Sequence, residues 1–143
     1  MKVEILKSID ARSVDQIGVL LNKLDPRVQA PDFNRLASLI NRADFTLFTA
    51  TDDKDNIVGM LTLTCCHTLS CSKYWIEDVV VDEVCRGKGV GRALVKAAVN
   101  HVKIMNENSV IYLTSNPSRV SARALYRSEG FEEYDTGVFR MKF

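Results

Sequence analysis

Residues 76–93 read Ile76-Glu77-Asp78-Val79-Val80-Val81-Asp82-Glu83-Val84-Cys85-Arg86-Gly87-Lys88-Gly89-Val90-Gly91-Arg92-Ala93. The first six residues are rich in β-branched side chains, which favour a strand. Glycines at alternate positions follow, and they predict a tight turn. From about Val90 onward, apolar residues recur at a spacing of three to four, which predicts a helix. The expected order is therefore strand, glycine turn, helix.

The junction between this turn and the helix is suited to binding a phosphate group. Backbone N–H groups and the positive end of the helix dipole converge there. Glycine allows a ligand to approach the backbone closely, because it carries no side chain. Arg86, Lys88 and Arg92 add positive charge to the same turn. We therefore expect an anion-binding loop at residues 86–92.

Two common phosphate-binding loops do not fit this sequence. A P-loop requires Ser or Thr after Gly-Lys to hold magnesium, whereas Gly91 is followed by Arg92 and Ala93. A dinucleotide-binding fingerprint requires Gly-x-Gly-x-x-Gly, whereas the spacing here is Gly87-x-Gly89-x-Gly91. The sequence argues against both classes of nucleotide-binding protein, and a purely structural glycine turn is the alternative to an anion site.

The composition suits one globular domain that covers residues 1–143, because 46% of the residues are hydrophobic and 26% are charged. The net charge of +1 gives no support for binding to nucleic acid or to an anionic membrane. No stretch approaches the ~20 apolar residues that span a bilayer, and the N-terminus lacks the apolar core of a signal peptide. The four cysteines form no Cys-x-x-Cys pair. We therefore expect a cytoplasmic protein with reduced thiols and no metal site.

The remaining patterns predict a mixed, mostly antiparallel central sheet flanked by helices, an α/β (α+β) fold. The expected strands cover residues 3–6, 45–50, 57–68, 73–81, 110–114, 131–134 and 138–143, the last two as a closing hairpin. The expected helices are one that Ser8 or Asp10 caps and that runs to Leu24, and three more at about 33–41, 90–106 and 118–130. A turn is expected at residues 106–108. The helical crossover should make strand 110–114 parallel to strand 73–81.

Two motifs carry a resemblance to a known family. The pattern Arg86-x-x-Gly89-x-Gly91, after a strand that ends Val79-Val80-Val81-Asp82, resembles the GCN5-related N-acetyltransferase (GNAT) family. The pattern Ala122-x-x-Leu125-Tyr126-x-x-x-Gly130-Phe131 is similar to a second segment of that family, in the family's order. The resemblance implies the acyl-CoA N-acyltransferase fold, with acetyl-CoA as co-substrate and no metal.

The resemblance also implies which residues bind the cofactor. The loop holds the pyrophosphate of acetyl-CoA, and the strand before it pairs with the pantetheine arm. Many members place Asn seven residues before the tyrosine, where this chain has Arg119, so Asn116 or Arg119 would lie near the pantetheine or adenosine. The implied cofactor-binding residues are Val79, Val80, Val81, Arg86, Gly87, Lys88, Gly89, Val90, Gly91, Arg92, Asn116 and Tyr126.

Acetyl transfer from a thioester makes demands that these residues can meet. A strand edge at residues 79–81 offers main-chain partners to the pantetheine amides if this strand splays from strand 110–114. A backbone N–H near Val79 would polarise the thioester carbonyl as negative charge develops. In family members a tyrosine at the position of Tyr126 lies near the sulfur, and a phenol can protonate the leaving thiolate. The alternative for Tyr126 is a buried structural aromatic residue.

The acceptor amine must lose a proton, because a free alkylamine has a pKa of ~10.4. Glu77 is the first candidate base, directly or through water, since burial in a strand raises the pKa of a carboxyl group. Asp78 is the alternative on the opposite face, since neighbouring strand residues alternate, so only one of the two should face the site. His67 is a third candidate, with a structural role as its alternative.

The expected function is that of an N-acetyltransferase acting on a primary amine, small-molecule or peptide, by direct transfer in a ternary complex. An aminosugar-phosphate acetyltransferase is an alternative, because Ile76-Glu77-Asp78-Val79 is similar to glucosamine-6-phosphate acetyltransferases. That function requires Arg27, Arg35 and Arg119 to converge. A non-catalytic acyl-CoA-binding module is the other alternative. Candidate acceptor contacts are Arg27, Gln29, Asp32 and Arg35, and a homodimer is common among similar proteins.

Overall fold

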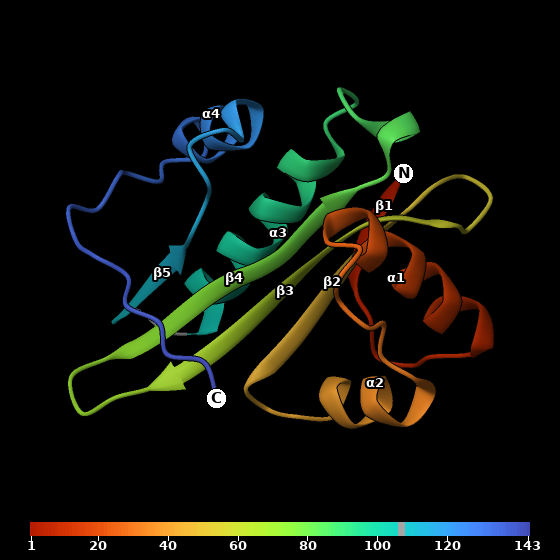
Figure 1. The fold of residues 1–143 in the computed structure, drawn as a ribbon, viewed down its shortest axis with the longest axis horizontal. Coiled ribbons are helices and arrows are strands. Elements are labelled where there is room, and N and C mark those ends of the chain that lie inside the picture. The colour runs from red at the N-terminus through yellow and green to blue at the C-terminus, as the bar shows by residue number, and fades with distance from the viewer. Residues whose placement is uncertain (106–107) are drawn as a thin grey trace.

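The computed structural model describes residues 1–105 and 108–143 and shows one mixed sheet with helices on both faces (Figure 1). The sheet order is β1-β2-β3-β4-β5, and only the β4–β5 pair is parallel. The strands are β1 (Lys2–Ile5), β2 (Phe45–Thr51), β3 (Ile57–His67), β4 (Ser72–Val81) and β5 (Ser109–Leu113). The helices are α1 (Ala11–Leu24), α2 (Phe33–Ile40), α3 (Val90–Met105) and α4 (Val120–Ser128), with a short 3-10 helix at Glu83–Cys85.

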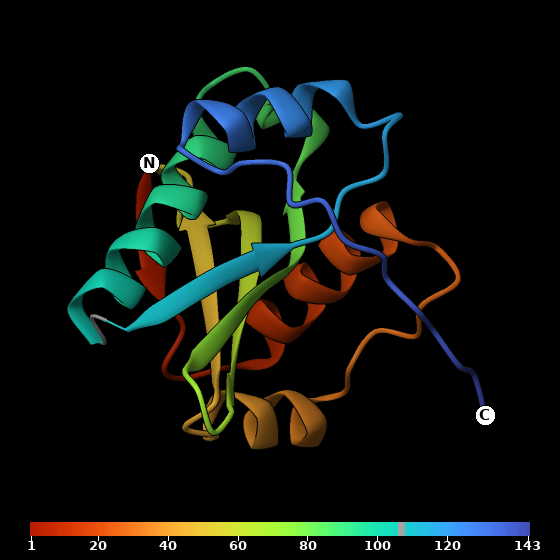
Figure 2. The same cartoon turned by 90° about the vertical axis from the view of Figure 1, so that its left-hand side faces the viewer.

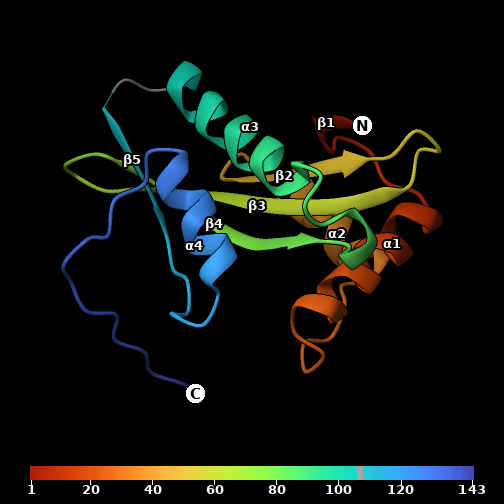
Figure 3. The same ribbon diagram turned by 90° about the horizontal axis from the view of Figure 1, so that it is seen from above.

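Helices α1 and α2 cover one face of the sheet, whereas α3 covers the other and α4 lies beside it (Figures 2 and 3). Each face has its own buried apolar cluster. The α3 side buries Phe48, Leu61, Leu63, Ile76, Leu94 and Val95, among others. The α1 side buries Ile17, Leu20, Leu36, Leu47, Met60 and Val80, among others. None of the described helices is both long and apolar enough to cross a bilayer.

Much of the predicted element order is confirmed. Strands β2, β3 and β4 form the expected antiparallel meander, and β5 is parallel to β4 after the α3 crossover. Asp10 rather than Ser8 caps α1, through a capping box in which Asp10 accepts from the Ser13 N–H at 2.7 Å. Part of the predicted turn at 106–108 lies outside the described residues.

The predicted closing hairpin is wrong, because residues 131–143 form neither a helix nor a strand. Glu133 is instead ion-paired with Arg123 at 2.8 Å and with Arg127, which ties the start of this segment to α4. The apolar residues that suggested a strand are open to solvent, with Phe139 98% exposed. Strand β5 therefore forms an edge of the sheet.

A β-bulge interrupts β4 opposite Leu61. Met60 pairs with Val80 and Thr62 pairs with Glu77, so Asp78 and Val79 together oppose one residue of β3. Asp78 has a φ of +50°, in the left-handed region that few non-glycine residues adopt. The bulge breaks the alternation of side chains at this point. Asp78 therefore need not lie on the face opposite Glu77.

We predict that Gly59→Ala destabilises the fold by about 1 kcal/mol, because an added Cβ would overpack the core. That Cβ would lie 3.0 Å from Val90 Cγ1 and 3.3 Å from the Val80 carbonyl oxygen. Gly137→Ala is the matched control, since its Cβ would meet only the Phe139 ring at 3.6 Å. Urea denaturation measures both variants, and equal midpoints for the two would contradict the packing described for α3 on β3.

Candidate functional site

The loop between the 3-10 helix and α3 has the backbone conformation that its glycines allow. Gly87 and Gly89 have φ values of +74° and +80°, which favour glycine. A Cβ added at either glycine would meet nothing within 4 Å, so backbone conformation rather than crowding calls for glycine at both positions. The space beside the loop is open, and Val90 begins α3 as a buried residue, as predicted.

The N–H groups of residues 87–92 donate to no acceptor in the described part of the chain. The first bond of the helix runs from the Ala93 N–H to the Gly89 carbonyl at 2.9 Å. These amides therefore remain available at the N-terminus of a helix from Val90 to Met105, where the helix dipole favours an anion.

The three cations of the loop differ in whether an acidic side chain is paired with them. Arg92 is ion-paired with Glu129, whose side chain is only 8% exposed. Arg86 lies 3.7 Å from Glu83 in an exposed pair, which a competing anion can replace at little cost. No described residue forms an ion pair with Lys88. The structure thus leaves Lys88 as the cation of the loop that is most available to a ligand.

Strands β4 and β5 diverge beside this loop, which meets the condition stated for main-chain pairing by residues 79–81. Their pairing runs from Ser72 with Ser109 to Ile76 with Leu113, whereas β4 continues to Val81 (Figure 1). Residues 77–81 of β4 therefore have no strand partner on the β5 side. Among residues 1–105 and 108–143, the one hydrogen bond to this stretch from the α4 side is long, at 3.5 Å, from Arg119 Nη2 to the Val79 carbonyl oxygen.

Tyr126 comes from α4, on the α3 side of the sheet, and is 5% exposed. Its ring meets Phe131 edge to face, with the centroids 6.1 Å apart. Its hydroxyl makes no hydrogen bond with any described residue. Burial raises the pKa of Tyr126, and the positive charge of Arg119 opposes that effect. Tyr126 therefore lies within electrostatic range of the guanidinium that reaches Val79.

The segment before α4 contains Asn116, which the sequence analysis named, and Ser115, which it did not. Asn116 Oδ1 accepts from the N–H and the hydroxyl of Ser118, at 3.0 Å and 2.9 Å, and so shapes the turn. The Oγ of Ser115 is buried without a hydrogen-bond partner. A serine after a strand is too common to have been noticed from the sequence alone, but a buried hydroxyl without a partner fits a polar ligand.

The prediction that Glu77 and Asp78 lie on opposite faces of β4 is wrong. Glu77 pairs with Thr62 across the sheet, and opposed residues share a face. Thr62 Oγ1 donates to Asp78 Oδ2 at 3.0 Å, so the bulge turns Asp78 to that same α1-side face. Loss of hydration raises the pKa of Glu77, and the negative charge of Asp78 raises it further.

Aromatic rings flank these carboxylates, and the sequence did not indicate their grouping. Trp75 shares the face of Glu77, two residues away on β4, and stacks on Tyr112 of β5 with a centroid distance of 5.1 Å. Tyr134 lies next in the row, 6.1 Å from Tyr112. Because these rings come from three separate segments, only the folded sheet brings them together.

Other predicted residues lie apart from this group. His67 is on the α3-side face, since it pairs with Ser72, and its Nδ1 lies 3.0 Å from the Ser72 hydroxyl. Arg27 is bonded to Asp25 at 2.8 Å, and Asp32 caps α2 by accepting from the Arg35 N–H.

The candidate acceptor contacts from the first two helices also lie apart from Glu77 and Asp78. No contact within the described chain unites Arg27, Arg35 and Arg119, and none places Gln29 beside Glu77.

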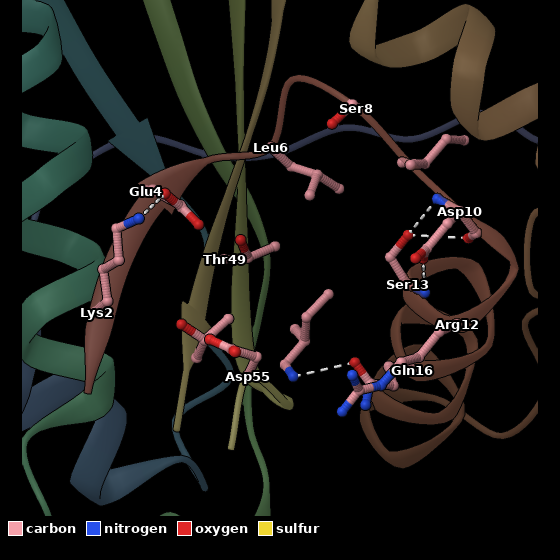
Figure 4. A pocket seen from close by; sticks show the side chains of 13 residues that line it. Lys2, Glu4, Leu6, Ser8, Asp10, Arg12, Ser13, Gln16, Thr49 and Asp55 are labelled. Atoms are coloured by element: carbon pink, nitrogen blue, oxygen red, sulfur yellow. Dashed lines mark hydrogen bonds and ion pairs between the residues drawn. The ribbon is translucent and has the colours of Figure 1, made fainter. Parts of the chain in front are cut away.

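A pocket of about 380 Å³ lies elsewhere, between α1 and the β1–β2 edge (Figure 4). Its polar groups are largely paired with one another, as in the Lys2–Glu4 ion pair at 2.6 Å and the Ile57 N–H bond to Gln16 at 3.1 Å. It includes none of the predicted site residues. Within residues 1–105 and 108–143, no three His, Cys, Asp or Glu side chains are placed to hold a metal ion.

The chain is similar to known acetyltransferases in sequence. A family model described as an acetyltransferase (GNAT) domain matches residues 43–133. Spermine/spermidine N(1)-acetyltransferase of Bacillus subtilis is 30% identical over 60 residues, which are 42% of this chain and 40% of that protein. The chain thus matches less than half the length of this curated relative.

The fold is also similar to solved acetyltransferase structures. An aminoglycoside acetyltransferase from an uncultured soil metagenomic sample has a TM-score of 0.86 and 22% identity, over 99% of this chain and 95% of that chain. Glucosamine-6-phosphate N-acetyltransferase from Arabidopsis thaliana has a TM-score of 0.77 and 20% identity, over 99% of each chain. At these identities the likeness concerns the fold.

We predict that Asp78→Asn lowers the pKa of Glu77, because it removes a like charge on the same face. The sign follows from the raised pKa in the folded protein, which keeps Glu77 protonated to a higher pH than an ordinary glutamate. Carboxyl-detected NMR titration measures the change, with Asp15→Asn on the exposed side of α1 as the control. An unchanged Glu77 titration in Asp78→Asn would show that the two carboxylates do not share a face.

Proposed function

Because the chain belongs to the GNAT acetyltransferase family, we propose that it transfers the acetyl group of acetyl-CoA directly to a primary amine in a ternary complex. The observation that carries this proposal is the junction of two main-chain segments, the loop amides and the β5 side of β4, that have groups without a main-chain partner. The N–H groups of residues 87–92 lie at the helix terminus, and residues 77–81 of β4 follow one another without a partner strand on the β5 side. A ligand with a diphosphate and an amide-containing arm satisfies both.

The residues around this junction fit acetyl-CoA, which supplies an activated acyl thioester when bound. The amides of the loop hold the diphosphate together with Lys88 and Arg86, and the diphosphate takes the place of Glu83 beside Arg86. Main-chain groups of residues 79–81 pair with the amides of the arm, and the Val79 N–H polarises the thioester carbonyl. Arg119 has to give up the Val79 carbonyl when an amide of the arm takes it.

Tyr126 protonates the thiolate that leaves. The Tyr126 side chain is 5% exposed, and its hydroxyl makes no hydrogen bond with any described residue, so its proton can be given to a thiolate that lies beside it. Its hydroxyl lies in the field of the Arg119 guanidinium, which also favours the negative charge that develops on the sulfur.

Glu77 accepts the proton of the amine, directly or through water. Its raised pKa makes it a better base than an ordinary glutamate, and it is ionised above that pKa. Glu77 and Tyr126 lie on opposite faces of the sheet. They can serve one reaction only where β4 and β5 diverge, which is where the unpaired part of β4 lies.

The two alternatives have less support. A sugar phosphate needs a cluster of cations, whereas Arg27 is tied to Asp25 and Arg119 reaches Val79. A non-catalytic acyl-CoA-binding module gives no role to a buried phenol without a partner and a carboxylate of raised pKa. We propose a small-molecule amine as the acceptor and the cytoplasm as the site of action.

We predict that Lys88→Ala raises the Kd for coenzyme A about five- to tenfold, because it removes the unpaired cation of the loop. Lys103→Ala is the matched control, since this exposed lysine lies in the last turn of the same helix. Isothermal titration calorimetry measures both. Gly89→Val, checked for folding by circular dichroism, should abolish binding. Equal affinity in Lys88→Ala and Lys103→Ala, with Gly89→Val still binding, would contradict the diphosphate site.

We predict that Glu77→Gln lowers kcat/KM about a hundredfold or more and removes the acidic limb of its pH profile. Tyr126→Phe should lower kcat far more than it weakens the binding of coenzyme A, because the loop amides and β4 provide most of the proposed cofactor contacts. A thiol-release assay with acetyl-CoA measures both against Asp15→Asn and Tyr74→Phe, which lie outside the proposed machinery. A protein that binds coenzyme A, but acetylates no amine in any form, would be the non-catalytic module.

A further inference from the structure

We propose that the pocket between α1 and the β1–β2 edge is a second ligand site, which we call the β1–α1 pocket. It binds a small zwitterion with one ammonium and one carboxylate group, which is the chemistry of a free amino acid. None of residues 77–81 or 86–92 lines this pocket. It has no part in acetyl transfer, so the proposed function does not depend on it.

The register of the sheet builds the pocket. Thr49 of β2 is opposite Glu4 of β1 on one side and Met60 of β3 on the other. Opposed residues share a face, so all three side chains point to the α1 side, where Met60 belongs to the buried cluster. Helix α1 packs on β3 and β4, which leaves a hollow of about 380 Å³ over the first two strands. This volume lies within the range of small-molecule pockets.

The floor of the pocket holds a polar group that the fold does not use. Thr49 is 1% exposed and lines the pocket, with its side chain between Glu4 and Arg12 (Figure 4). Its hydroxyl makes no hydrogen bond with any described residue. Such a group is normally paired, because losing water costs free energy unless another partner replaces it. The pocket is the space beside this hydroxyl, so a ligand there supplies the missing partner.

The β1 side of the pocket has more carboxylates than cations. Lys2 is ion-paired with Glu4 at 2.6 Å, and its positive charge also acts on Asp55. The Asp55 carboxylate lines the pocket, and within the described chain it forms neither an ion pair nor a hydrogen bond. One cation thus serves two carboxylates. The ammonium group of a ligand balances the remaining negative charge.

The α1 side presents a guanidinium without a carboxylate partner among the described residues. Arg12 donates to Asn56 Oδ1 at 2.8 Å and to the Lys54 carbonyl at 3.4 Å, and both acceptors are neutral. The nearby Asp10 is committed to capping α1, where it accepts from the Ser13 N–H at 2.7 Å. A guanidinium has five N–H donors in a planar fork, so Arg12 can bind a carboxylate while it keeps its contacts with the turn.

The two sides together select the class of ligand. An anion would meet Arg12 but would also lie in the field of Glu4 and Asp55, and such like-charge contacts reject a ligand. A simple cation would leave the guanidinium without a carboxylate, and a neutral polyol would balance neither side. A zwitterion places its ammonium toward Asp55 and its carboxylate toward Arg12. The Thr49 hydroxyl can accept from the first group or donate to the second.

Amide NMR of the full chain locates and measures the binding. The ligands are glycine, β-alanine and 4-aminobutyrate, which hold the two charges progressively further apart, with butylamine and butyrate as single-charge controls. At least one amino acid should shift the amides of Thr49 and Arg12 and bind about tenfold more tightly than either control. A control that binds as tightly as every amino acid would overturn the inference. Shifts confined to residues 75–81 would also overturn it, because they would place the amine beside the unpaired part of β4.

Thr49→Val tests whether the hydroxyl is kept for a ligand. Valine preserves the shape of the side chain, so binding of the best amino acid should fall about fivefold while the urea midpoint stays the same or rises. Thr46→Val is the matched control, since Thr46 lies on the same strand opposite Leu63, in the cluster on the α3 side. Unchanged binding in Thr49→Val would contradict the proposed site. A lower urea midpoint than that of Thr46→Val would show that the hydroxyl serves the fold instead.

Charge variants test the orientation of the ligand. Asp55→Asn and Arg12→Gln should each weaken binding about fivefold, whereas Asp15→Asn should have no effect. Asparagine tolerates the φ of +58° at this position, so the turn is retained. Equal affinity in all three variants would defeat the inference. Acetyl transfer without amino-acid binding at Thr49 would uphold the proposed function alone, and binding there without acetyl transfer would uphold this pocket alone.

Discussion

The parallel ladder between β4 and β5 ends at Ile76 and Leu113, although β4 itself continues to Val81. The bulge at Asp78 and Val79 begins just beyond this point, and bulges bend and twist the strand that contains them. The left-handed backbone of Asp78, held through Thr62, keeps the bulge in place. Without it, β4 would have a regular register, and its carboxylates would be divided between the two faces. The bulge thus accounts both for the stretch of β4 without a partner strand and for the presence of Glu77 and Asp78 on the same face.

Local features of this region could be predicted from the sequence because they depend on neighbouring residues. The glycine turn and the start of α3 at Val90 follow from backbone preference and from apolar spacing within one segment. The parallel direction of β5 follows from the handedness of a helical crossover. The position of Asp78 could not be predicted, because the alternation rule assumes a regular register. A bulge is a property of two strands, and neither strand shows it alone.

Long-range pairing explains the other differences. Residues 138–143 alternate like a strand, but a strand forms only where a partner pairs with it, and Glu133 ties the preceding segment to α4. The sequence also shows three cations in the loop without their partners. Arg92 is held by Glu129, which lies 37 residues later, so only the structure reveals that Lys88 is the available charge.

The net charge of +1 conceals a division of charge that the proposed reaction can use. Positive charge and free amides gather at the start of α3, whereas Glu77 and Asp78 gather on the α1 side of β4. The first arrangement attracts an anionic cofactor, and the second attracts a cationic amine. If both charges lay on one face, the two substrates would compete for the same groups. Because the sheet separates them, each substrate can approach from its own side and meet the other where β4 has lost its partner strand.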